Sequence, residues 1–151
     1  MGEKHRIEVI ARGVCVMDGQ ILLCHGKASG LTYLPGGHVE FGETARQALV
    51  REMREESGRQ SEAGRFLGCC EHTFTQNGKP CAEINLVFEL TVEGVSPQEQ
   101  VAAAEDWIGF RWHPLDSLVT AHFEPAALGP QLIHWLAQPG AHIATSVSEQ
   151  A

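Results

Sequence analysis

The first third of the chain reads as a series of short extended segments. Residues 6–26 hold two runs rich in β-branched and aliphatic side chains, with Asp18-Gly19 between them. An Asp-Gly pair in that position is a strong hairpin signal, so we expect two antiparallel strands here. A further short segment around Tyr33 and Leu34 ends at Pro35.

The pattern becomes helical from Thr44 to about Ser57. Thr44 and Gln47 have the spacing of a capping box, and Gly58 is a suitable C-terminal stop. Apolar residues recur at helical spacing and predict one buried stripe. This stripe consists of Ala45, Ala48, Leu49 and Met53.

The second half returns to extended segments. Residues 64–75 and 81–92 predict two strands joined by a turn at "NGKP". A polar, alanine-rich connector leads to a third strand, "WIGFRW", at 107–112. A turn or short helix then begins at Pro114, because proline favours the first position of a turn or helix.

The chain ends in a closing helix at 126–137, with Gly129-Pro130 as a weak point or a new start. A length of 151 residues suits one domain with a proper core. We therefore expect a single domain over residues 1–138 and a flexible tail over 139–151.

Composition and charge narrow the class of protein. Apolar residues make up 43% of the chain and charged residues 20%, which is typical of a globular domain. A formal net charge of −8 argues against binding to nucleic acid, since such binding relies on lysine and arginine. The sequence contains no apolar stretch of membrane-spanning length and no signal peptide. Its five cysteines form no CxxC pair, so we expect reduced thiols in a cytoplasmic protein.

The helix at 44–57 carries an unusual group of acids. Glu52, Glu55 and Glu56 are spaced i, i+3 and i+4, so they share one face and repel one another. Glu55 and Glu56 also lie in the last turn, where the helix dipole disfavours negative charge. Two interpretations compete, a solvated acidic face and a site for a hard cation such as Mg²⁺, with Mn²⁺ as an alternative.

The surrounding residues favour the cation site and identify a family. Gly36 and Gly37 precede the helix and allow close backbone approach, and Arg51 adjoins the acids. The segment resembles the Nudix box, G-x5-E-x7-R-E-U-x-E-E-x-G-U, where U is aliphatic. The matching positions are Gly37, Glu43, Arg51, Glu52, Met53, Glu55, Glu56 and Gly58. The one departure is Arg59 at the final aliphatic position.

The resemblance covers residues 6–138, including the hairpin before the box, the hairpin after it and the final helix. It implies an α/β fold, an α/β/α sandwich around a central mixed β-sheet. It also implies hydrolysis of a nucleoside diphosphate linked to another group, assisted by Mg²⁺. In this family the box glutamates bind metal, which assigns that role to Glu52, Glu55 and Glu56. The backbone carbonyl of Gly37 is a further expected ligand, and Arg51 is expected to orient the glutamates.

Other residues are candidates for proton transfer and substrate binding. The general base is either a box glutamate or an acid outside the box, where Glu105 is the first candidate and Glu83 the second. His38 lies in the loop of the box and is a candidate contact for a phosphate. Three aromatic residues are candidates for stacking on a base. These residues are Tyr33, Phe74 and Trp112.

Three functions remain open at this stage. The first is a Mg²⁺-dependent pyrophosphohydrolase acting on nucleoside triphosphates, including oxidised ones, or on small nucleotide conjugates. The second is a catalytically inactive Nudix-fold module that binds or senses a nucleotide. The third is an acidic interaction domain without metal, which predicts no stabilisation by Mg²⁺. The resemblance also leaves a homodimer open.

Overall fold

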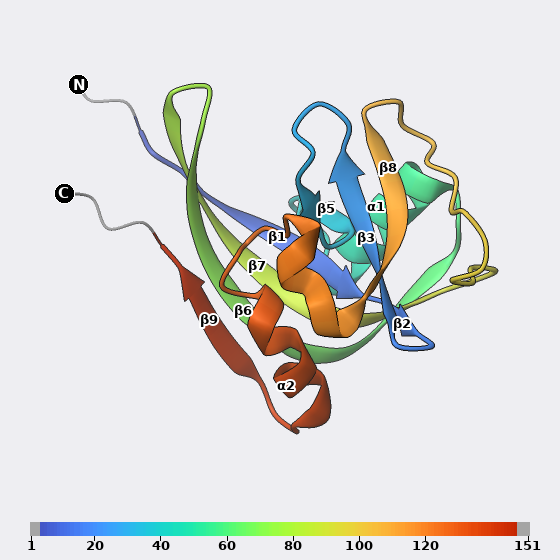
Figure 1. Ribbon diagram of the computed structural model, residues 1–151. Helices are drawn as coiled ribbons and strands as arrows, with labels where there is room; N and C mark the ends of the chain where they lie inside the picture. Colours follow the sequence, from blue (N-terminus) through green and yellow to red (C-terminus); the bar gives the residue numbers. More distant parts are fainter. Residues whose placement is uncertain (1–3, 148–151) are drawn as a thin grey trace.

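Two β-sheets lie between helix α1 on one side and the C-terminal helical segments on the other (Figure 1). The computed structural model describes residues 4–147. Its strands are β1 (Ile7–Val14), β2 (Val16–Met17), β3 (Gln20–Gly26), β4 (Thr32–Tyr33), β5 (Gly36–His38), β6 (Ser61–Gln76), β7 (Lys79–Val92), β8 (Ile108–Pro114) and β9 (His142–Ser146). Its helices are α1 (Ala45–Ser57) and α2 (Leu132–Ala137), and its 3₁₀ helices are η1 (Leu115–Ala121) and η2 (Gly129–Gln131).

The larger sheet is mixed and has the strand order β5-β1-β7-β6-β9. Strand β1 runs parallel to β7 and antiparallel to β5. Strands β6 and β7 form a long antiparallel hairpin, which is the green and yellow-green ribbon of Figure 1. The smaller sheet is antiparallel and joins β2, β3 and β4, with β8 beside β3.

Strand β3 shows why the fold is a sandwich. Ile21 and Leu23 enter the core that packs against α2 and η1. Leu22 and Cys24 point the opposite way, into the core that packs against α1. Because successive strand residues face opposite sides, burial of all four requires a covered surface on each side. The predicted α/β sandwich with a mixed sheet is therefore confirmed.

Helix α1 forms as its sequence predicts. The Thr44 side chain accepts a hydrogen bond from the Gln47 N–H at 3.1 Å, and the Gln47 side chain accepts one from the Thr44 N–H at 2.8 Å. Gly58 adopts a left-handed conformation with φ of 72°, and its N–H donates to the Arg54 carbonyl. This conformation stops the helix at little cost because glycine lacks a Cβ atom.

The expected hairpin over residues 6–26 is correct only around its turn. Strands β2 and β3 pair across Asp18-Gly19, but Val16 and Met17 alone form the first arm. The preceding strand β1 leaves this hairpin at Cys15 and joins β7 in the larger sheet. Strand β1 joins the larger sheet because it pairs in parallel with the distant strand β7. Such long-range pairing leaves no local turn signal in the sequence.

The predicted flexible tail is wrong for residues 142–146. Strand β9 pairs in parallel with β6, from Gly68 opposite His142 to His72 opposite Ser146. Ala144 is 3% exposed, and the His142 ring stacks on Trp135 with centroids 5.7 Å apart. The burial of Ala144 and the pairing of β9 with β6 order this segment, although its amino-acid composition suggests a tail. Residues 148–151 of the expected tail lie outside the described part of the chain.

The closing helix is shorter than the 12-residue pattern suggested, because the chain forms η2 at Gly129 and only then enters α2. This agrees with the interpretation of Gly129-Pro130 as a new start. Among residues 4–147, none of the helices combines the length and the apolar character needed to cross a lipid bilayer.

Candidate metal and substrate site

The three acids of α1 line one cavity of about 510 Å³. It lies where α1 meets β5, the adjoining strands β1 and β7, and the segment before β8. Its walls include all of the predicted cation ligands together with further acids and aromatic residues. These lining residues include Tyr33, Gly36, Gly37, His38, Glu52, Glu55, Glu56, Glu83, Glu105 and Trp107.

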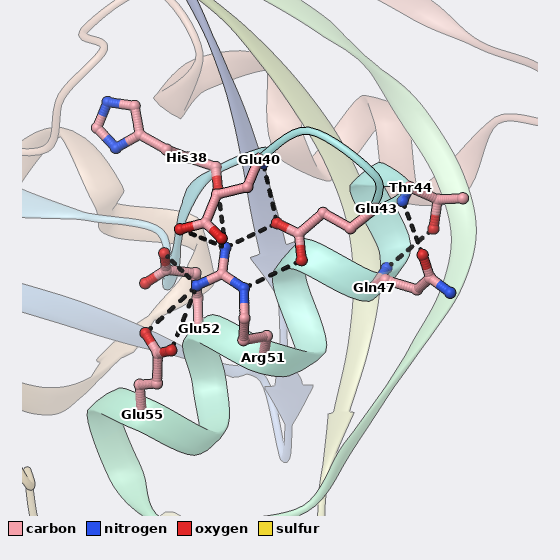
Figure 2. Close-up of polar contacts among 8 residues, drawn as sticks. All are labelled: His38, Glu40, Glu43, Thr44, Gln47, Arg51, Glu52 and Glu55. Carbon is pink, nitrogen blue, oxygen red and sulfur yellow. Dashed lines mark hydrogen bonds and ion pairs between the residues drawn. The ribbon is translucent and has the colours of Figure 1, made fainter.

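Arg51 ties the loop before α1 to the acidic face (Figure 2). Its Nε and Nη2 atoms donate to the two carboxylate oxygens of Glu43 at 3.0 and 2.7 Å. Its Nη1 atom donates to Glu52 at 3.0 Å and approaches Glu55 at 3.3 Å. Its Nη2 atom also donates to the His38 carbonyl at 3.0 Å. One guanidinium therefore joins both ends of the loop to two of the acids.

Glu43 makes the shortest of the ion pairs that hold Arg51 in place. The hydrogen bonds from Arg51, followed by one from the Glu40 N–H, lower the pKa of Glu43 to about 2. The same contact with Glu43 raises the pKa of Arg51 above its ordinary value. Glu43 therefore serves to hold Arg51 beside the loop that precedes α1.

Glu56 has a different environment. Its residue is 6% exposed, and its nearest side-chain partner is the Cys24 thiol at 3.9 Å. Burial, and then the negative charge of Glu52, raise the pKa of Glu56 to about 8, although the positive charge of Arg12 and the Gly36 N–H hydrogen bond oppose this shift. No lysine or arginine forms an ion pair with Glu56 among the described residues. A buried carboxylate without a cationic partner is costly unless a ligand supplies the positive charge.

The two glycines before α1 allow the backbone to reach the acids. A Cβ atom on Gly36 would lie 2.9 Å from the Ala11 carbonyl carbon, and one on Gly37 would lie 2.6 Å from a Glu52 carboxylate oxygen. Gly36 also has a φ of 141°, which other residues rarely adopt. The cavity wall is therefore built for close packing of backbone against the Glu52 carboxylate.

This donor set has the chemistry of a hard-cation site, because it offers carboxylate and backbone oxygens to Mg²⁺ or Mn²⁺. As they stand, however, no three histidine, cysteine, aspartate or glutamate side chains within residues 4–147 converge closely enough to hold a metal ion. Glu52 and Glu55 are turned toward Arg51. Binding of a cation would therefore require these side chains to rotate toward Glu56.

The remaining site candidates are distributed around the same cavity. Glu105 and Glu83 both line it. Glu83 accepts a hydrogen bond from the Asn85 side chain at 3.4 Å. His38 also lines it, but its Nε2 atom lies 2.8 Å from the Glu8 carboxylate and its side chain is 61% exposed. A phosphate contact by His38 would therefore compete with Glu8.

The aromatic candidates do not all lie together. Tyr33 lines both this cavity and an adjoining one of about 880 Å³, and burial raises its pKa to about 12. Phe74 lines only the larger of these two cavities, and its ring stacks on His72 with centroids 5.0 Å apart. Trp112 lines neither cavity and packs against the core that contains α1, so it lies apart from the other two aromatic candidates.

Sequence reasoning missed two residues at this site. Trp107 lines the smaller cavity and is 60% exposed, although it was assigned only to the start of a strand. Arg12 lines both cavities from within β1. An arginine between apolar residues of a strand was the available signal, since buried strands rarely carry an arginine without a reason.

Comparison with known families agrees with the fold. The model of the NUDIX domain matches residues 4–136. The CTP pyrophosphohydrolase of Escherichia coli (strain K12) is 45% identical over 65 residues, which are 40% of this chain and 47% of that protein. The ADP-ribose pyrophosphatase of Methanocaldococcus jannaschii is 29% identical over 130 residues, or 84% of this chain and 73% of that protein. The aligned segment thus spans about half the length of the first relative.

Solved structures support the same architecture. The solution structure of the E. coli ORF135 protein has a TM-score of 0.56 and 25% identity, with 88% of this chain and 91% of that chain covered. The crystal structure of the MutT protein from Methanosarcina mazei Go1 has a TM-score of 0.66 and 21% identity, with 90% and 97% covered. At 21% identity, the similarity to the Methanosarcina mazei structure shows the fold alone.

Proposed function

Because the chain belongs to the NUDIX family, we propose that it is a Mg²⁺-dependent pyrophosphohydrolase. Its substrate is a nucleoside diphosphate linked to another group, and the products are the two halves of the cleaved diphosphate. The observation that carries this proposal is Glu56, a buried carboxyl that lines the cavity beside Glu52 and forms no ion pair among the described residues. A divalent cation would offset both charges.

The box residues divide into cation ligands and a positioning residue in the proposed reaction. Glu52, Glu55 and Glu56 would hold the cation, and the Gly37 carbonyl would be a fourth protein ligand. When bound, Mg²⁺ neutralises the diphosphate, polarises phosphorus and acidifies the attacking water. Arg51 limits the positions that Glu52 and Glu55 can adopt, since it contacts both carboxylates.

Glu105 is the proposed general base. It lines the cavity and is close enough to Glu56 for its charge to raise the pKa of that residue. In the reaction the Glu105 carboxylate accepts a proton from water as the water oxygen bonds to phosphorus and the bridging P–O bond breaks. Glu83 is the alternative base, although its hydrogen bond with Asn85 already uses one carboxylate oxygen.

The substrate is proposed to extend from the acidic cavity into the larger one. Tyr33 and Phe74 are the aromatic surfaces available for a base there, and His38 is the candidate phosphate contact at the other end. A volume of about 880 Å³ is within the range of small-molecule sites. The names of the relatives make CTP-like triphosphates and ADP-ribose-like conjugates the first compounds to examine.

A panel of nucleoside triphosphates and diphosphate conjugates, incubated with Mg²⁺, with Mn²⁺ or with EDTA, tests this function. Chromatography of the products identifies both the substrate and the bond that is cleaved. We expect metal-dependent release of a nucleoside monophosphate from at least one compound. Nucleotide-dependent stabilisation without turnover of any compound would instead indicate the inactive binding module.

A further inference from the structure

The cavity that contains the acids opens into a second, larger cavity. The two share four lining residues, Arg12, Tyr33, Gln76 and Glu83, so they adjoin along this boundary. The smaller cavity is acidic, because its walls carry five glutamates. Within the described part of the chain, Arg12 is the only lysine or arginine in the lining of either cavity.

Arg12 is held rigidly at this boundary. Its Nε atom donates to the Asn85 side-chain oxygen at 3.2 Å, and its Nη1 atom donates to the Leu34 carbonyl at 3.0 Å. Asn85 is itself 1% exposed, and its amide donates to the Cys70 carbonyl. The guanidinium also lies over the Tyr33 ring, 5.5 Å from its centroid. Arg12 is therefore placed by buried partners.

These partners give Arg12 no direct ion pair, although its positive charge lies close enough to Glu56 to lower the pKa of that residue. Both of its hydrogen-bond acceptors are neutral, and no carboxylate of residues 4–147 lies within ion-pair distance of it. Its Nη2 atom has no hydrogen-bond acceptor among the same residues. Arg51 differs in this respect, since four glutamates already surround it. Of these two arginines, only Arg12 has a donor without an acceptor and no ion pair, so it can still bind an incoming anion.

We propose that Arg12 binds the phosphate attached to the nucleoside, at the boundary between the two cavities. This inference rests on the proposed function and names a residue that determines how the substrate lies. The nucleoside then occupies the larger cavity, beside Tyr33, and the rest of the diphosphate extends over the glutamates. Because Arg12 is fixed by Asn85 and Leu34, it also fixes which phosphorus atom lies beside the acids.

Equilibrium binding of AMP and CMP, compared with adenosine and cytidine, tests this role without requiring turnover. NMR titrations in the presence of excess Mg²⁺ would give the affinity of each compound. We expect Arg12→Gln to weaken binding of the monophosphates roughly 10- to 100-fold and to leave nucleoside binding unchanged, since a charge-assisted contact is lost. The affinity of Arg12→Lys for monophosphates should lie between those of the wild type and Arg12→Gln, because lysine keeps the positive charge but lacks the planar guanidinium.

Arg46→Gln is the matched control. Arg46 also donates to neutral acceptors, the Ala63 and Gly64 carbonyls, and lies over the Phe88 ring, but it lines neither cavity. The Arg46→Gln variant should therefore have the same affinity for monophosphates as the wild type. Stabilisation by Mg²⁺ alone should not weaken in Arg12→Gln, since removal of a cation cannot reduce the attraction of the glutamates for Mg²⁺.

The outcomes separate this proposal from a purely structural role. The proposal is overturned if Arg12→Gln weakens the binding of monophosphates and nucleosides equally, or if it leaves both affinities unchanged. It is also overturned if the wild type binds monophosphates no more tightly than nucleosides. A phosphate contribution that depends on Arg12, found in a protein that hydrolyses nothing, would support this site and refute only the proposed hydrolase.

Discussion

Replacement of Glu56 by glutamine should stabilise the protein when metal is absent. Glu56 is 6% exposed, and burial together with Glu52 raises its pKa from 4.5 to about 8. The unfolded chain ionises this carboxyl freely at pH 7, whereas the folded protein must retain the proton or bury the charge. The difference corresponds to roughly 3 kcal/mol of unfolding free energy. Glutamine removes this cost and keeps an oxygen for the Gly36 N–H.

The sign and the pH window of this effect follow from the two pKa values. Below pH 4.5 the Glu56 carboxyl is protonated in both states, so the wild type bears no cost. The cost grows as pH rises from 4.5 to about 8 and is constant above that range. The advantage of Glu56→Gln should therefore increase across this window.

Urea unfolding in EDTA at several pH values, followed by circular dichroism, measures this advantage directly. Glu55→Gln is the control, since the Glu55 side chain is 55% exposed and its loss should change stability by less than about 0.5 kcal/mol. Addition of Mg²⁺ should stabilise the wild type more than Glu56→Gln, because a ligand stabilises only the folded form that binds it. A Glu56→Gln variant that is less stable than the wild type in EDTA at pH 8 would refute the reasoning.

Three further predictions concern the same site. Gly37→Ala should weaken thermal stabilisation by Mg²⁺ and lower kcat roughly 100-fold, since its Cβ would lie 2.6 Å from a Glu52 oxygen and would restrict the positions of this carboxylate. Gly64→Ala, whose Cβ would have its nearest neighbour at 3.4 Å, should preserve both properties. Glu43→Gln should destabilise the protein above pH 4.5, and acid titration should show this deficit shrinking as pH falls toward 2, because the depressed pKa of Glu43 stabilises only the ionised form. Glu105→Gln should lower kcat by roughly 10²- to 10⁴-fold while stabilisation by Mg²⁺ persists, and unchanged kcat would exclude Glu105 as the base.

Local signals in the sequence were sufficient for α1 and the family. The Thr44 cap, the Gly58 stop and the buried stripe all lie within 15 residues, and the structure confirms each of them. The match of the NUDIX domain to residues 4–136 confirms the Nudix resemblance. The roles of the individual glutamates stay predictions, because they concern a bound cation and a reaction.

Long-range pairing explains what the sequence did not reveal. Strand β1 joins β7 across more than 70 residues, and this pairing places Arg12 beside Asn85. Strand β9 likewise pairs with β6, from a segment whose composition suggests a tail. Neither contact has a turn or a fixed spacing that would mark it in the sequence. The boundary between the two cavities therefore emerges only from the three-dimensional arrangement.

The most direct test of the central claim is turnover of the preferred compound by the wild type and by Glu56→Gln, with saturating Mg²⁺ and with both proteins shown to be folded. The account predicts Mg²⁺-dependent release of a nucleoside monophosphate by the wild type. It predicts that the Glu56→Gln rate is lower by at least about 100-fold, although the variant is the more stable protein in EDTA. Equal turnover by the two proteins, or turnover that persists in EDTA, would contradict the claim that the acidic face of α1 is a hydrolytic metal site.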